Sequence, residues 1–131
     1  MYNIVIASNL EDMKKFIKGF GYAFSGLGYA FKSQLNFKVH VSFALLVAIS
    51  GYCFKLSSSE WLWIIASIGL VLMTELINTA IEQLVDLVSP EIHPKAKIIK
   101  DVAAGAVLVA AITAAGIGLV IFIPKILQYA A

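Results

Sequence analysis

Long apolar runs separated by short polar breaks dominate the chain from residue 39 onward. They occupy about 39–54, 61–88 and 102–123, and the last two reach the roughly 20 residues that a helix needs to cross a bilayer. The first run is shorter, which predicts a helix that begins in the interface or crosses a thin region of bilayer. Pro124 follows the third run and is expected to end its helix. The pattern therefore predicts three membrane-spanning helices.

A periodic segment of a different kind, about residues 10–31, precedes these runs. Apolar side chains recur there every three or four residues with lysines between them: Phe16, Phe20, Phe24, Leu27 and Phe31, with Lys14, Lys15 and Lys18. This spacing is typical of an amphipathic helix that lies on the membrane surface. The alternative is a helix packed on a soluble core, but the rest of the sequence offers no such core. We therefore expect an all-α membrane protein with one surface helix, forming a single domain over 1–131.

Composition agrees with a membrane protein and gives nucleic acid no support as a partner. The 131 residues are 60% hydrophobic and 14% charged, and the formal net charge is only +2. The lysines are unevenly placed, because eight precede residue 39 or lie within 95–100, while Lys55 and Lys125 lie elsewhere. By the positive-inside rule, the N-terminus and the 89–100 loop are predicted to face the cytoplasm, in a multi-pass protein of the cytoplasmic (inner) membrane.

Polar side chains interrupt the second apolar run at helical spacing. On an α-helix of about 100° per residue, Glu75, Asn78, Glu82 and Asp86 fall within an arc of roughly 80°. Ionisable groups at bilayer depth cost on the order of 3 kcal/mol each, so a membrane helix that carries several is expected to use them. We predict that this polar stripe faces protein or water and not lipid.

The polar stripe and the basic segment after it have the chemistry to handle a phosphorylated nucleotide. Glu75 is the deepest carboxylate and suits a general base. Glu82 and Asp86, nearer the water, can hold magnesium, which in turn binds phosphate oxygens. Lys100 can neutralise phosphate charge. Other polar residues stand at the same junction: Glu91, His93 and Asp101. The pattern alone leaves three roles open: a catalytic site, a path for ions or protons, and a structural polar seam between helices.

The order of these motifs resembles a known family. Glu75-x-x-Asn78-x-x-x-Glu82-x-x-x-Asp86 is followed by Glu91-Ile-His93-Pro and by Lys100-Asp101-Val-Ala-Ala-Gly-Ala-Val. The series resembles the small prokaryotic diacylglycerol kinase family, which includes the undecaprenol kinases of Gram-positive bacteria. Two N-terminal motifs are similar to that family as well: Phe20-Gly-Tyr22-Ala-Phe24-Ser-Gly26-Leu and Asn36-Phe37-Lys38-Val-His40. The resemblance runs from about Met13 to Pro124, nearly the whole chain.

The resemblance implies a homotrimeric bundle of three-span subunits, each with an amphipathic surface helix, and active sites between neighbouring subunits at the cytoplasmic face. It implies transfer of the γ-phosphate of ATP, with Mg²⁺ as cofactor, to the hydroxyl of a membrane lipid. That lipid is diacylglycerol, giving phosphatidic acid, or undecaprenol, and the sequence does not separate the two. Glu75 matches the family's catalytic base, and Glu82 matches a metal ligand that also touches the nucleotide.

Further positions match the family by role. The nucleotide-binding set is Lys15, Tyr22, Gln34, Asn78, Glu82, Asp86, Glu91, His93, Lys100 and Asp101. The lipid-binding set is Lys15, Phe24, Phe31, Asn36, Phe37, Lys38 and Glu75. One position departs from the pattern, because Gln34 stands where many members carry a glutamate that helps to hold metal. An amide oxygen is a weaker ligand than a carboxylate, so Gln34 is the weaker of the two candidate metal ligands.

Two rival functions use the same polar stripe. A small trimeric ion or proton channel predicts ion flux in liposomes without ATP. A non-catalytic assembly subunit predicts no ATP binding and tolerance of Glu75→Leu. Neither rival explains why polar groups gather on the face predicted to meet cytosolic nucleotide.

Overall fold

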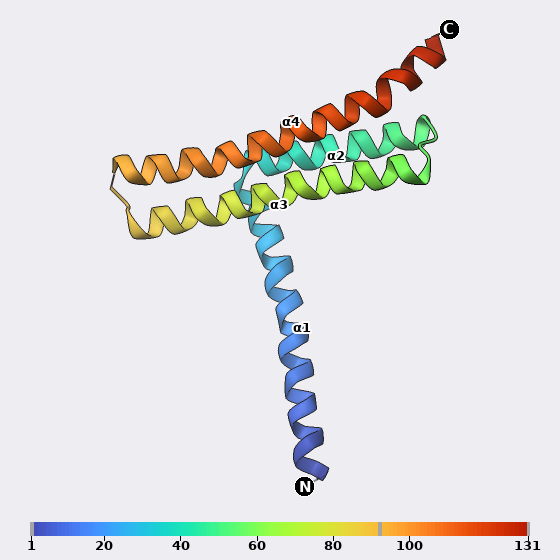
Figure 1. The fold of residues 1–131 in the computed structure, drawn as a ribbon. Coiled ribbons are helices and arrows are strands. Elements are labelled where there is room, and N and C mark those ends of the chain that lie inside the picture. Colours follow the sequence, from blue (N-terminus) through green and yellow to red (C-terminus); the bar gives the residue numbers. More distant parts are fainter. Residues whose placement is uncertain (1, 92, 131) are drawn as a thin grey trace. The chain divides into compact units, whose positions relative to one another are not determined.

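The computed structural model describes the backbone of residues 2–91 and 93–130 and the side chains of residues 11–91 and 93–129. All regular secondary structure in those ranges is helical: α1 (Tyr2–Ser33), α2 (Leu35–Cys53), α3 (Ser58–Val88) and α4 (Pro94–Ala130) (Figure 1). Of these, α2, α3 and α4 are long and apolar enough to cross a membrane. The predicted all-α class and three candidate spans are therefore confirmed.

The chain divides into two compact units, one ending at Gln34 and the other beginning at Leu35. The first unit is built on α1, which is longer than the predicted 10–31 segment. Within it, the rings of Phe16 and Phe20 pack edge to face with centroids 5.1 Å apart. The position of α1 on the membrane surface, the homotrimer and the single-domain organisation stay predictions.

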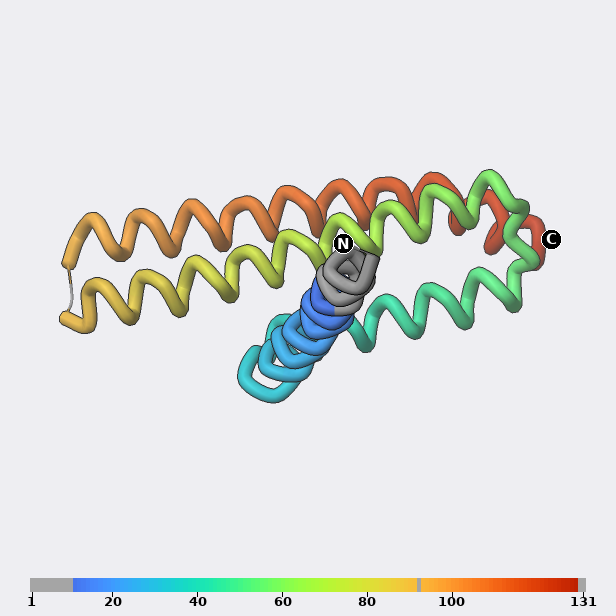
Figure 2. Tube along the Cα trace, turned by 90° about the horizontal axis from the view of Figure 1, so that it is seen from below, coloured from blue at the N-terminus to red at the C-terminus, as the bar shows by residue number. Residues whose placement is uncertain are grey.

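In the second unit α3 is the central helix. It contacts both α2 and α4, whereas α2 and α4 make no close backbone contact with each other in the part of the chain that the structure describes. Figures 1 and 2 show α4 running beside α3 over most of its length. The buried residues of α4 nearest its start are Ala103, Val107 and Ala110. Small side chains at two of these three positions let the two helices approach closely.

A tight turn joins α2 to α3. Lys55 adopts the left-handed conformation at φ 51°, and the Leu56 amide donates to the Gly51 carbonyl at 3.0 Å, as in a Schellman cap. A Cβ at Gly51 would lie 2.5 Å from Leu56 Cδ1 and 2.9 Å from Trp61 Cη2. The close approach of these side chains therefore favours glycine at position 51.

Capping and an ion pair secure the start of α3. The Ser57 amide donates to Glu60 Oε2 at 2.7 Å and the Glu60 amide donates to Ser57 Oγ at 3.4 Å, which forms a capping box. The other carboxylate oxygen of Glu60 lies 3.1 Å from Lys125 Nζ. This end of α3 is thereby tied to the far end of α4.

The predicted loop 89–100 was wrong in its second half. Pro94 is the first residue of α4, so Lys95, Lys97 and Lys100 lie on a helix, and the connection between α3 and α4 takes up only residues 89–93. Proline suits the first helical position, because its missing N–H would have no helical partner there and its φ is already helical. Lysine is also a good helix former, so a basic segment need not be a loop.

The prediction that Pro124 ends the third span was wrong as well. Pro124 lies inside α4, which continues to Ala130. An interior proline costs about 3 kcal/mol, and contacts on both sides of it offset that cost. The Phe54 ring packs edge to face on Phe122 at 6.0 Å and on Tyr129 at 5.6 Å, and Lys125 holds Glu60. The helix is thus anchored before and after its proline.

Candidate functional site

The polar stripe follows one face of α3 and becomes more open toward the end of the helix. Glu75 is 2% exposed and Asn78 is 5% exposed, Glu82 is half-buried, and Asp86 is exposed. Buried apolar residues continue the same face toward the start of α3, including Ile64 and Val71. The helical repeat therefore places a buried carboxylate at one end of the stripe and accessible carboxylates at the other.

Asn78 links the buried and accessible parts of the stripe. Its Nδ2 donates to Glu82 Oε1 at 3.0 Å, a contact that the i, i+4 spacing allows. Asn78 Oδ1 and Glu75 Oε2 are buried without a hydrogen-bond partner among the described residues. A buried acceptor left unsatisfied costs about 1–3 kcal/mol. Two such acceptors lie about one helical turn apart. They would suit a bound group that donates hydrogen bonds, such as a hydroxyl.

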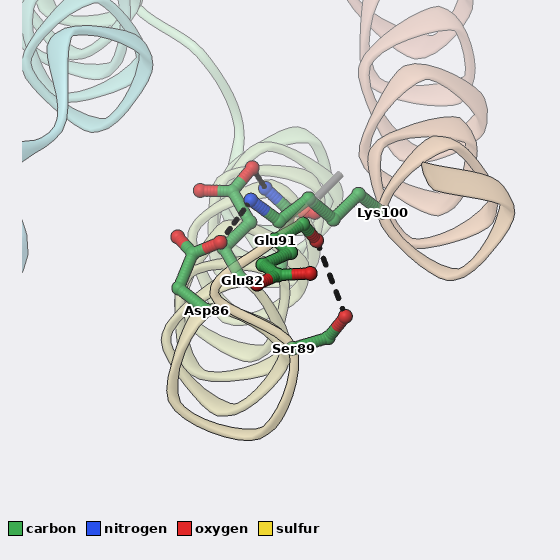
Figure 3. Close-up of polar contacts among 6 residues, drawn as sticks. Glu82, Asp86, Ser89, Glu91 and Lys100 are labelled. Carbon is green, nitrogen blue, oxygen red and sulfur yellow. Dashed lines mark hydrogen bonds and ion pairs between the residues drawn. The ribbon is translucent and has the colours of Figure 1, made fainter. Parts of the chain in front are cut away.

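An ion pair closes the open end of the stripe against α4. Lys100 Nζ lies 2.5 Å from Asp86 Oδ1, although the two residues are 14 apart in the chain. Figure 3 shows Glu82, Asp86 and Lys100 gathered between the ends of α3 and α4 (Figure 3). Ser89 Oγ donates to the Glu91 carbonyl at 3.3 Å in the adjoining connection. The pair places a cation beside two carboxylates, the arrangement that could exchange with a phosphate and its metal.

Two other predicted residues make local contacts. Asp101 Oδ2 lies 2.5 Å from Lys97 Nζ on the exposed side of α4. His93 Nδ1 accepts from the Lys95 amide at 3.2 Å, so this histidine caps the start of α4. Contacts of His93 and Asp101 with a nucleotide stay predictions.

The remaining predicted residues fall in two places. Lys15, Tyr22, Phe24, Phe31 and Gln34 belong to the unit of α1, which is described separately, so their part in the site stays a prediction. On the first turn of α2, Asn36 is exposed, Phe37 is buried at 4% and Lys38 is half-buried. The structure therefore brings together Asn78, Glu82, Asp86 and Lys100, with Glu75 on the same face and Glu91 on the adjoining connection.

The described side chains could hold magnesium only together with ligands from water and the substrate. No group of three or more His, Cys, Asp and Glu side chains that could hold a metal occurs in the part of the chain that the structure describes. Magnesium usually takes one or two protein carboxylates and completes its shell with water and substrate phosphates. Glu82, oriented by Asn78 through Oε1, fits the role of such a carboxylate.

Sequence reasoning missed an apolar cavity of about 360 Å³ among α2, α3 and α4. Its lining includes His40 of α2, the last residue of the motif Asn36-Phe37-Lys38-Val-His40. The small side chains of α4 at Ala111, Ala114, Ala115 and Gly118, spaced three and four apart, were the available signal. Their spacing marks one helical face that leaves room beside it.

Comparisons with known proteins agree on one family. Residues 21–122 match the model described as prokaryotic diacylglycerol kinase. The chain is 43% identical over 116 residues to the undecaprenol kinase of Bacillus subtilis (strain 168), covering 88% of this chain and 94% of that protein. It is 40% identical over 110 residues to a diacylglycerol kinase of Synechocystis sp., covering 83% of this chain and 63% of that protein. It is 30% identical over 109 residues to the diacylglycerol kinase of Escherichia coli (strain K12), covering 83% of this chain and 89% of that protein. The matched residues include the whole polar stripe and Lys100.

Proposed function

The chain belongs to the prokaryotic diacylglycerol kinase family and is a multi-pass membrane lipid kinase, and from that premise we propose that it transfers the γ-phosphate of ATP to the hydroxyl of undecaprenol or diacylglycerol. The observation that carries the proposal is the buried, unpartnered Oε2 of Glu75, on the same helical face as the polar cluster of Asn78, Glu82, Asp86 and Lys100. A carboxylate in that position can accept a proton from a hydroxyl that approaches from the membrane.

Glu75 acts as the general base in this proposal. It accepts the proton of the lipid hydroxyl as the hydroxyl oxygen attacks the γ-phosphorus and the bond to the β-phosphate oxygen breaks. Phosphoryl transfer needs mainly positioning and electrostatic stabilisation from the protein. Burial of Glu75 keeps water from competing for the base, because only 2% of the residue is exposed.

The nucleotide occupies the open end of the stripe in this proposal. Lys100 exchanges Asp86 for phosphate oxygens, which carry more negative charge than one carboxylate. Asn78 fixes the orientation of Glu82, the carboxylate that would hold magnesium together with the phosphates. Bound magnesium would supply charge neutralisation of the phosphates. Nucleotide contacts by Glu91, His93 and Asp101 are also part of the proposal, as are nucleotide or lipid contacts by the other matched positions that the resemblance names.

The proposal includes a homotrimer in the cytoplasmic membrane, with the N-terminus and residues 89–100 on the cytoplasmic side. The uneven distribution of lysine supports this orientation. The unpartnered acceptors of Glu75 and Asn78 fit a site completed from outside the subunit. The comparisons give the channel alternative no support.

Purified protein with γ-labelled ATP and each lipid in turn tests the proposal. We expect labelled lipid phosphate from the wild-type protein, and a fall of about 10²–10⁴-fold in kcat for Glu75→Gln, the usual contribution of a general base. Glu11→Gln, an exposed carboxylate of α1, is the matched control and should keep full activity. No labelled lipid from the wild type would refute the kinase assignment, and near-normal turnover by Glu75→Gln would refute the base assignment.

A further inference from the structure

Glu75 has little direct access to water through which it could lose a proton. Only 2% of the residue is exposed, and its Oε2 has no hydrogen-bond partner among the described residues. The proposed reaction leaves the proton of the lipid hydroxyl on this carboxylate, which must lose it before it can act as a base again. A second group that accepts the proton and lies nearer to water would make this step faster.

Two groups are candidates for that acceptor. Among the described residues, His40 on α2 and Glu82 on α3 are the ionisable groups that lie close enough to Glu75 to act on it electrostatically. Glu82 is oriented by Asn78 and is assigned to magnesium, and a proton on it would remove the charge that holds the metal. Histidine can accept a proton on one ring nitrogen and release one from the other. His40 is therefore the better candidate.

The packing of α2 against α3 brings His40 near the level of Glu75. At the turn between these antiparallel helices, a Cβ on Gly51 would lie 2.9 Å from Trp61 Cη2. His40 precedes Gly51 by as many residues as Leu72 follows Trp61, and both His40 and Leu72 line the apolar cavity. Glu75 follows Leu72 by three residues, which is about 4.5 Å along the helix at 1.5 Å per residue.

His40 and Glu75 also lie on facing sides of α2 and α3. The cavity that His40 lines is bounded on α3 by residues that include Ser67, Val71 and Leu72. At about 100° per residue, Glu75 falls within the arc that these three residues span, one turn beyond Val71, although it does not itself line the cavity. No other lining residue is ionisable, and α4 contributes only apolar side chains and a glycine. His40 is therefore the one proton acceptor of the cavity wall, at the end nearest Glu75.

The start of α2 connects His40 to more open surroundings. His40 is half-buried, whereas Glu75 is buried. It lies on the second turn of α2, and Asn36, about one turn before it, is exposed. Lys38, the other ionisable residue at this end of the helix, is half-buried. A proton that reaches His40 is thus closer to water than a proton on Glu75.

We propose that His40 is the proton relay that returns Glu75 to its basic form after each phosphoryl transfer. The O–H bond of the protonated Glu75 carboxyl breaks and an N–H bond forms on the imidazole, directly or through one bridging water. The other ring nitrogen then gives its proton to water near the start of α2, which restores neutral His40. The inference rests on the proposed function, because it takes Glu75 as the base. It goes further by assigning the step that prepares Glu75 for the next turnover to a residue that acts through Glu75 and does not touch the reacting atoms.

Comparison of the first turnover with later ones separates a relay from a structural role. His40→Gln keeps a hydrogen-bonding side chain but cannot pass a proton on. Mixed rapidly with γ-labelled ATP and the lipid that the wild type phosphorylates faster, undecaprenol or diacylglycerol, it should complete its first turnover at the wild-type rate, because Glu75 starts without the proton. Its steady-state kcat should then be about 10²-fold below that of the wild type, with an unchanged KM for ATP. A first turnover slowed as much as the later ones, or a normal steady-state kcat, would overturn the inference.

Added imidazole tests whether the lost function is proton transfer. His40→Gly leaves room for free imidazole beside the cavity of about 360 Å³. Imidazole should restore much of the lost steady-state kcat of this variant, in proportion to its concentration until the site is filled. Ser42→Gly, at an exposed position of the same turn of α2, is the matched control for a glycine in the helix and should keep its activity with or without imidazole. No recovery of His40→Gly, or an equal recovery of Glu75→Gln, would overturn the inference.

The amount of lipid phosphate formed in the first turnover counts the active subunits. Loss of folded protein in a variant lowers that amount and does not imitate a slow later turnover. The same measurements keep this inference apart from the proposed function. A wild-type protein that phosphorylates neither lipid refutes the function, whereas an active wild type with a normal steady-state kcat for His40→Gln refutes only the relay.

Discussion

Asn78 and Glu82 show how a single hydrogen bond can set the geometry of a carboxylate. Asn78 is buried and donates to Glu82 Oε1, so the orientation of a half-buried side chain is fixed from the interior. Asparagine does this without adding another charge to the stripe, and a second carboxylate at position 78 would repel Glu82. The two residues therefore have different tasks: Asn78 orients the carboxylate, and Glu82 carries the charge.

Removing the charge of Glu82 tests its role toward magnesium. Glu82→Gln keeps an oxygen that can accept from Asn78 but is a weaker metal ligand, so the Mg²⁺ concentration for half-maximal activity should rise by about tenfold or more. Activity is titrated against Mg²⁺ at saturating ATP, with Glu11→Gln as the control. An unchanged magnesium requirement would argue against Glu82 as a ligand.

Two lysines of α4 allow a matched comparison. Lys100 pairs with Asp86 of α3 and Lys97 pairs with Asp101 of its own helix, each at 2.5 Å. Exposed ion pairs contribute about 0.2–1 kcal/mol, so Lys100→Met and Lys97→Met should each destabilise the protein only slightly. Only Lys100→Met should raise the KM for ATP, by about tenfold or more, since a lost hydrogen bond to a charged group costs roughly 1.5–3 kcal/mol. Equal effects of the two variants on the KM would contradict the phosphate role of Lys100.

At the scale of elements, the turn between α2 and α3 is tightly packed. Gly51, Leu56 and Trp61 crowd together there, and Lys55 takes the left-handed position that ends α2. The capping box at Ser57 starts the next helix two residues after Lys55. This connection therefore fixes how α2 packs against α3. It also fixes the position of α2 as one wall of the cavity.

Replacing glycine by alanine is expected to have opposite effects on stability at this turn and elsewhere in the unit. Gly51→Ala should lower the free energy of unfolding by about 1–3 kcal/mol, because the new Cβ collides with Leu56 and Trp61. Gly105→Ala should raise it by about 0.5–1 kcal/mol, since a Cβ there meets no atom within 4 Å and alanine is the better helix former. Reversible unfolding in mixed micelles measures both changes. Changes of the same sign would contradict the crowding at the turn.

The apolar runs predicted the long helices because length and hydropathy are local properties of the chain. The same reasoning failed at Pro94 and Pro124, where it treated proline only as a helix breaker. Whether proline starts, interrupts or ends a helix depends on the contacts around it. The contacts that hold α4 on either side of Pro124 come from Glu60 and Phe54, which are far away in the chain. Contacts of that kind cannot be deduced from the local pattern.

The candidate site also contains a part that the local pattern predicts and a part that depends on contacts between distant residues. The stripe of Glu75, Asn78, Glu82 and Asp86 follows from helical spacing alone. The pairing of Asp86 with Lys100 depends on the register of α4 against α3, which the sequence does not express locally. The cavity is lined by residues of three helices, so it could not be predicted before the packing of those helices was known.

At the scale of the whole molecule, orientation in the membrane can be tested with introduced cysteines. The native thiol is first removed by Cys53→Ser. Single thiols are then placed at two exposed positions, by Ser59→Cys near the start of α3 and by Lys95→Cys near the start of α4, which follows the other end of α3. A membrane-impermeant maleimide should label Ser59→Cys in intact spheroplasts, and Lys95→Cys only after permeabilisation, because basic segments stay in the cytoplasm. The reverse order of labelling would refute the proposed orientation.

The distance along α3 between the ion pairs Glu60–Lys125 and Asp86–Lys100 indicates which bilayer thickness suits the protein. Along α3 they are about 39 Å apart at 1.5 Å per residue, which exceeds a hydrocarbon core of roughly 30 Å. Both pairs can therefore sit in headgroup layers only when the bilayer is neither much thinner nor much thicker than that span. A mismatched bilayer would make the helices tilt and would shift the depth of Glu75 relative to the lipid hydroxyls. The thickness of the host membrane would in this way set how well base and substrate meet.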